Sequence, residues 1–64
     1  MQVLYRQEGI LKEDARTDSC FIAAGTPVSV EQVLTEGHEV AILIISQDCA
    51  ILLNHITDIA SLID

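Results

Sequence analysis

The chain has 64 residues, an apolar content of 50% and a formal net charge of −7. A chain this short forms one domain, expected over residues 1–64, near the lower limit at which a single apolar core suffices. Three Lys and Arg against ten Asp and Glu exclude direct binding of nucleic acid, whose affinity depends on basic side chains. One Phe and one Tyr likewise exclude binding sites built from several aromatic rings.

The charge is distributed unevenly along the chain. Residues 1–16 hold all three bases together with three acids and are neutral, whereas residues 17–64 hold seven acids and no base. Such a surface attracts basic partners and accelerates their encounter. The same charge also keeps an aliphatic small domain in solution, which is the simpler explanation for it.

The N-terminal third predicts short extended segments separated by polar ones. Residues 2–5 predict a strand, residues 6–9 a turn, and residues 10–11 the start of another extended segment. The polar, mixed-charge stretch 12–19 predicts a surface loop. No apolar segment follows a basic start here, as it would in a signal peptide, so we expect a cytoplasmic location.

Residues 20–22 resume the apolar pattern, and residues 23–26 predict a turn in which Gly25 adopts a positive φ. The segment that follows is ambiguous. Residues 27–31 alternate as a half-buried strand does, and their β-branched side chains favour a strand. However, residues 29–36 also fit a capped helix, with a capping box at its start and Gly37 as a stop.

The most apolar stretch lies between two histidines, His38 and His55. Two aliphatic runs, 40–45 and 49–53, flank a short polar break, which predicts a core hairpin over residues 39–53. The break also excludes one membrane-spanning helix, which needs about 20 apolar residues. The side chains expected to be buried are Ile42, Ile44, Ile51 and Leu53.

The last ten residues predict one helical turn followed by an extended end. Thr57 or Asp58 would cap the turn. The apolar residues that recur at a spacing of three would pack inward: Ile56, Ile59 and Leu62.

Two stretches, FIAAGTPVSV at 21–30 and LLNHITDI at 52–59, resemble small SH3-like β-barrels. In the stretch 21–30, an apolar pair precedes Ala-Gly-Thr-Pro and an alternating strand. The stretch 52–59 is similar to the strand and single turn that close such barrels. The resemblance implies an all-β, partly open barrel of about five short strands with one helical turn near the C-terminus. The alternative is an α+β fold with a helix at about 29–36.

Four residues invite a zinc interpretation: Cys20, His38, Cys49 and His55. Their single, scattered spacing argues against it, because structural zinc sites present ligands in close pairs. We therefore expect no metal and no cofactor, and two buried free thiols in a reducing cytoplasm. A core this small also leaves no room for a catalytic pocket, so we expect no enzyme.

Two hypotheses for function remain. The first is a non-catalytic protein-interaction module, a regulator or accessory subunit that docks on a basic protein surface; an inhibitor that imitates nucleic-acid charge is a special case. The second is a self-associating module that uses its aliphatic excess to form a homo-oligomer. The residues predicted to contact a basic partner are Glu31, Glu36, Glu39 and Asp48.

Overall fold

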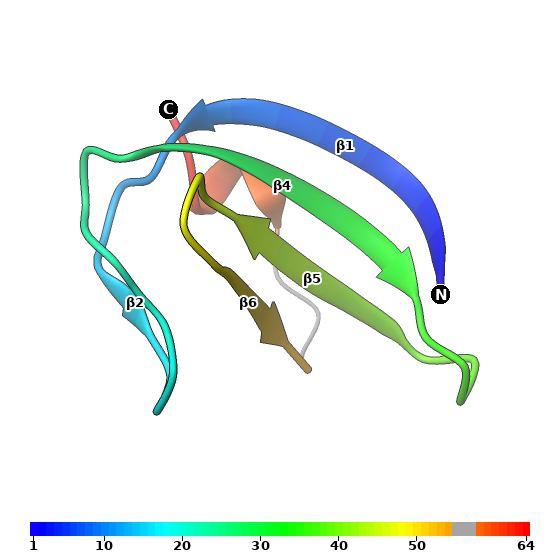
Figure 1. Cartoon of the computed structure of the whole chain (residues 1–64). Coiled ribbons are helices and arrows are strands. Elements are labelled where there is room, and N and C mark those ends of the chain that lie inside the picture. The colour runs from blue at the N-terminus through cyan, green and yellow to red at the C-terminus, as the bar shows by residue number, and fades with distance from the viewer. Residues whose placement is uncertain (55–57) are drawn as a thin grey trace.

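The computed structural model, which describes residues 1–54 and 58–64, is a small all-β fold with one C-terminal 3-10 turn (Figure 1). The elements are β1 (Gln2–Ile10), β2 (Ala15–Arg16), β3 (Phe21–Ile22), β4 (Pro27–Leu34), β5 (Val40–Ile45), β6 (Ala50–Leu53) and the 3-10 turn η1 (Ile59–Ser61). The all-β prediction is confirmed. Because β4 is extended throughout, the alternative helix at 29–36 does not form.

Four strands make one antiparallel sheet in the order β1-β4-β5-β6, and it does not close into a barrel. Strands β2 and β3 form a separate two-stranded ribbon, seen in Figure 1 beside the β6 end of the sheet. Strands β1 and β6 are therefore the two edges of the main sheet, while β4 and β5 have a neighbour on both sides.

The core hairpin is confirmed as β5 and β6. Ile42 pairs with Leu53 and Ile44 with Ile51. The turn between the strands is closed by the Ser46 amide, which donates to the Cys49 carbonyl at 2.9 Å. Of the four side chains expected to be buried, the three isoleucines are at most 2% exposed. Leu53 is only half-buried, because it ends the edge strand β6.

Residues that pair directly across an antiparallel sheet share a face. One face carries Val28 and Val30 of β4 beside Ile42, Ile44 and Ile51, and we call it the core face. Apolar side chains from outside the main sheet join this cluster: Leu11, Cys20, Ile22, Ile59 and Ile63. The opposite face, called here the outer face, includes the row Val3, Val33 and Ala41.

The C-terminal segment returns to the end of β1, a contact that the predicted extended end did not specify. Ile10 and Asp64 exchange two backbone hydrogen bonds, of 3.2 and 2.9 Å, and Leu11 bridges Ile63. Gly9 permits this crossing, because a Cβ there would lie 2.6 Å from the Asp64 carbonyl oxygen. Any larger residue would push the segment away.

Turn η1 precedes that segment and is capped by Asp58, whose Oδ1 accepts from the Ala60 amide at 3.1 Å. Ile59 is buried and Leu62 half-buried, in agreement with the inward packing predicted for them. The other candidate cap and apolar residue of that prediction, Thr57 and Ile56, lie outside the described residues.

Two local predictions for the N-terminal third are wrong. Residues 6–9 do not form a turn, because eight of the nine residues of β1 pair with β4, with a register irregularity between Val3 and Tyr5. The stretch 12–19 is not all loop, because β2 within it pairs with β3. The polar composition of residues 6–9 and 12–19 did not predict these strands, because an edge strand or a two-stranded ribbon can form without an apolar face. The positive φ predicted for Gly25 is confirmed at 89°.

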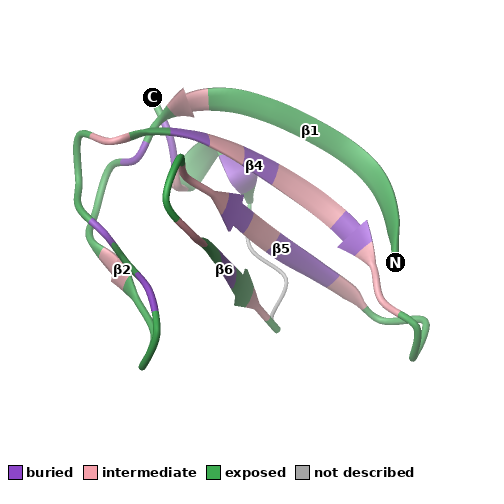
Figure 2. Ribbon diagram, in the orientation of Figure 1, coloured by how far each residue is buried: buried purple, intermediate pink, exposed green. Residues whose placement is uncertain are grey.

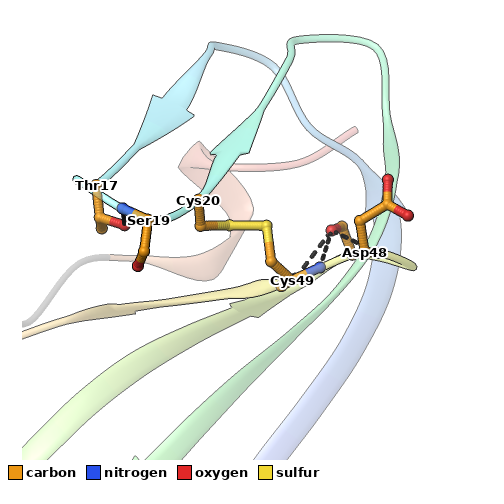
Figure 3. The surroundings of a disulfide bond; sticks show 6 residues. Thr17, Ser19, Cys20, Asp48 and Cys49 are labelled. Atoms are coloured by element: carbon orange, nitrogen blue, oxygen red, sulfur yellow. Dashed lines mark hydrogen bonds between the residues drawn. A yellow bond between two sulfur atoms is a disulfide. The ribbon is translucent and has the colours of Figure 1, made fainter.

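The prediction of free thiols is also wrong, because Cys20 and Cys49 form a disulfide, with their Cα atoms 6.0 Å apart (Figure 3). Cys20 lies just before β3 and Cys49 just before β6, 29 residues later. The expectation rested on the reducing cytoplasm and not on geometry. The fold brings the ribbon end against the β5–β6 turn, which sequence spacing alone does not reveal.

Candidate interaction surfaces

Glu36 and Glu39 lie together in the exposed turn between β4 and β5. The turn is ordered by Thr35, whose amide donates to the Glu39 carbonyl at 2.8 Å and whose hydroxyl accepts from the Glu39 amide at 3.2 Å. His38 completes it with a φ of 61°, the left-handed region that tight turns use. Glu36 and Glu39 are therefore two exposed acidic residues of one turn whose backbone is ordered.

Glu31 does not join them. It lies within β4 on the outer face, with its side chain 12% exposed, 3.9 Å from the guanidinium of Arg6. Arg6 also donates to the Ser29 hydroxyl at 3.0 Å. The direct pairing of Arg6 with Glu31 across β1 and β4 makes this contact possible. Glu31 is therefore little exposed, and its carboxylate has an ion-pair partner within the chain.

Asp48 is exposed in the β5–β6 turn, at the opposite end of the sheet from Glu36 and Glu39. The six residues of β5, at about 3.4 Å each, separate the two turns by about 20 Å. Asp48 instead lines a groove of about 470 Å³ with Phe21, a side chain 58% exposed. The four predicted contact residues thus form three separate sites, of which only the pair Glu36 and Glu39 lies together.

The basic side chains are few and mostly engaged. Besides Arg6, Lys12 lies 3.9 Å from a carboxylate oxygen of Asp64 and donates to the Ala60 carbonyl at 3.1 Å. Among the described residues, Arg16 is the base with no acidic group within ion-pair distance. The molecular surface is consequently dominated by carboxylates.

Sequence reasoning missed the exposed apolar character of β1. Figure 2 shows β1 exposed along most of its length, in contrast to the buried segments of β4 and β5. Among the described residues, seven large apolar side chains are exposed, and five belong to residues 1–10: Met1, Val3, Leu4, Tyr5 and Ile10. The available signal was a strand-forming, apolar stretch that coincides with the neutral part of the chain.

The described side chains that could take part in catalysis or metal binding are dispersed over the molecule. Both cysteines are in the disulfide, and no three His, Cys, Asp or Glu side chains gather to hold a metal in the part of the chain the structure describes. His38 is at an exposed turn, and His55 lies outside the described residues. A cavity of about 210 Å³ between β2 and the core face has an apolar floor that includes Ile44, Ile51 and Leu62.

No protein family model matches the chain, and no curated protein or solved structure is significantly similar to it. Across residues 1–54 and 58–64, no helix is long and apolar enough to cross a membrane. The surfaces described above are therefore interpreted from their geometry and charge alone.

Proposed function

We propose that this protein is a non-catalytic interaction module that binds a basic, partly apolar surface of a larger protein. The observation that carries the proposal is the pair Glu36 and Glu39, exposed on an ordered turn of a chain whose net charge is −7. A turn whose backbone is already ordered loses little backbone conformational entropy on binding. Negative potential around them accelerates encounter with a basic surface.

The acidic turn has an apolar neighbour. Gln2 pairs with Leu34, the last residue of β4, so the start of β1 lies beside the turn that follows. Val3 and Leu4 there are 51% and 47% exposed. One end of the sheet thus combines carboxylates with exposed aliphatic side chains, which matches a partner surface that is both basic and apolar.

The non-catalytic part of the proposal is supported by the cavities. Ligand pockets usually measure roughly 300–1,000 Å³ and combine an apolar lining with a few convergent polar groups. Two surface grooves, of about 470 and 560 Å³, are within this range of volume, and the cavity beneath β2, at about 210 Å³, is below it. No polar or charged side chain is buried in any of them among the described residues. Such a site offers no group whose reactivity burial has altered.

We further propose an SH3-like relationship for the fold. Its support is the topology: β4, β5 and β6 form a meander, the β2–β3 ribbon is inserted before it, and η1 precedes a segment that returns to β1. Barrels of this shape serve unrelated functions, so the relationship adds nothing on the partner. Imitation of nucleic acid would require Asp48 and the Glu36–Glu39 pair to engage one partner across about 20 Å.

The cytoplasmic location stays a prediction, and the Cys20–Cys49 bond weighs against it. Glutathione and thioredoxin keep thiols reduced in the cytosol, whereas disulfides persist in oxidising compartments. Mass spectrometry of protein alkylated before lysis measures the state of both cysteines and distinguishes the two environments.

A charge reversal tests the acidic contact. The probe is a fluorescent amphipathic peptide with Lys and Leu repeated at helical spacing, titrated at low and high salt. The wild type should bind the peptide, and its affinity should fall as salt is added, because salt screens the interaction between exposed charges. The double variant Glu36→Lys/Glu39→Lys should bind about tenfold more weakly, since each exposed charge contributes up to about 1 kcal/mol.

The matched control is Glu13→Lys/Asp18→Lys, two exposed acids elsewhere on the molecule. Each Glu or Asp to Lys change adds +2, so both double variants have a formal charge of −7 + 4 = −3. The control should retain most of the binding. Equal losses in the two variants would show that net charge alone attracts the peptide, and the acidic turn would then be excluded as the contact.

A further inference from the structure

The edge of β1 that faces away from β4, called here the outer edge, is partly unpaired. The backbone hydrogen bonds at the end of β1 show which of its residues direct their amide and carbonyl groups to this edge. Ile10 exchanges both of its backbone bonds with Asp64, outside the main sheet, whereas the Leu11 amide donates to Thr26 on the β4 side. Because backbone groups alternate along a strand, Glu8 and Arg6 direct theirs to the same outer edge as Ile10. No described residue forms a hydrogen bond with these backbone groups of Arg6 and Glu8.

Unpaired edge strands are templates for pairing with another chain. Proteins usually protect them with charge, and most of this molecule is strongly acidic. The β1 strand is the exception, because its charged residues, Arg6 and Glu8, cancel. Its side chains are also among the most exposed apolar ones of the chain, with Tyr5 at 52%. A second copy of this acidic chain therefore meets the least repulsion at β1.

We propose that residues 5–9 of β1 pair with the same residues of a second copy, antiparallel, about a two-fold axis at Gln7. This register places Arg6 opposite Glu8 of the second copy, and Glu8 opposite its Arg6. Opposite charges directly across an antiparallel pair are stabilising, and both residues present outward backbone groups, which form the narrow, hydrogen-bonded pairs. The register is thus complementary in charge and in backbone direction.

The ends of the paired segment also have physical limits. Beyond Gly9, the outer edge is occupied by Asp64 at Ile10, so the incoming strand must leave the ladder opposite that residue. In the proposed register the residue of the second copy at that point is Leu4, where β1 has its register irregularity. Such irregularities bend a strand, which lets the second copy diverge there. The pairing joins two four-stranded sheets into one continuous sheet.

This pairing uses the middle of β1 and is independent of the acidic turn that carries the proposed function. It also has the opposite response to salt. The two copies repel at long range because each has a charge of −7, so added salt should strengthen the dimer. Binding of the basic peptide weakens with salt instead, so the two interactions are measured separately.

Sedimentation equilibrium over a concentration series up to millimolar tests the proposal. The average mass of the wild type should rise with concentration from 7.0 kDa, the mass of one chain, to twice that value. The variant Glu8→Pro should stay at the monomer mass, because proline removes only the outward-pointing amide and is tolerated at such edge positions. Circular dichroism should be unchanged, since the amides that bond to β4 remain. A wild type that stays monomeric, or a dimer that survives in folded Glu8→Pro, overturns the proposal.

A pair of charge variants tests the register itself. Glu8→Arg places like charges opposite each other in a self-dimer, and so does Arg6→Glu, so each should remain monomeric alone. Mixed together they should associate, because every opposed pair is again of opposite sign. Arg6→Glu also loses its ion pair with Glu31, and its folding is checked by amide proton spectra before mixing. A mixture that does not associate, when both variants are folded and the wild type dimerises, overturns the register.

Discussion

Strands β1 and β5 belong to the same sheet and are separated only by β4, yet they are built differently. Strand β5 has neighbours on both sides and buries Ala41, Ile42 and Ile44. Strand β1 is longer, and all of its residues except Gly9 are exposed. The backbone ladder to β4 holds β1 in place, whereas apolar burial holds β5. A strand held in this way can change its side chains at little cost to stability, which leaves them available for recognition.

The largest effect that distinguishes the two strands is truncation of a core side chain. Ile42→Ala should lower the free energy of unfolding by about 2–5 kcal/mol, because the side chain is fully buried and the cavity refills only in part. Leu4→Ala, in a residue 47% exposed on β1, should cost less than about 1 kcal/mol. Chemical denaturation of dilute protein measures both. Equal costs would show that β1 contributes to the core as much as β5 does.

The disulfide should contribute almost as much to the free energy of unfolding as the Ile42 side chain does. It joins the β2–β3 ribbon to the β5–β6 turn and lies away from the middle of β1 and of β5. Closing a loop of 29 residues removes about 3.5 kcal/mol of entropy from the unfolded chain. Reduction should lower the free energy of unfolding by about this amount. The double variant Cys20→Ala/Cys49→Ala should lose similar stability and no longer respond to reductant. Two titratable thiols in denatured, never-reduced protein would show that the bond is not formed.

The smallest effect is expected at the point where β1 meets the C-terminal segment. Gly9→Ala should cost about 1–3 kcal/mol, because its Cβ would lie 2.6 Å from the Asp64 carbonyl oxygen and the segment must shift. Gly37→Ala is the matched control, since the nearest atom to its Cβ is the Thr35 hydroxyl oxygen at 3.9 Å. The control should be neutral or slightly stabilising. A neutral Gly9→Ala would mean that the C-terminal segment does not rest against β1.

The sequence was most informative where one physical signal dominated. The aliphatic runs that became β5 and β6, the turn between them and the alternation that became β4 all followed from periodicity. The positive φ of Gly25 and the Asp58 cap, one of two candidate caps, followed from residue type instead. The prediction of a turn at residues 6–9 was wrong. An edge strand is held by hydrogen bonds to the neighbouring backbone, so it does not require an apolar pattern of its own.

For the candidate site, the sequence by itself determined the acidic charge and the neutrality of the N-terminal segment. Only the tertiary structure separated Asp48 from Glu36 and Glu39 and placed Glu31 beside Arg6, because position within a sheet depends on register and strand direction. The disulfide likewise depends on two chain segments that meet across the fold. Charge and periodicity are local properties that a sequence displays directly. Contacts between distant segments exist only once the strands have paired.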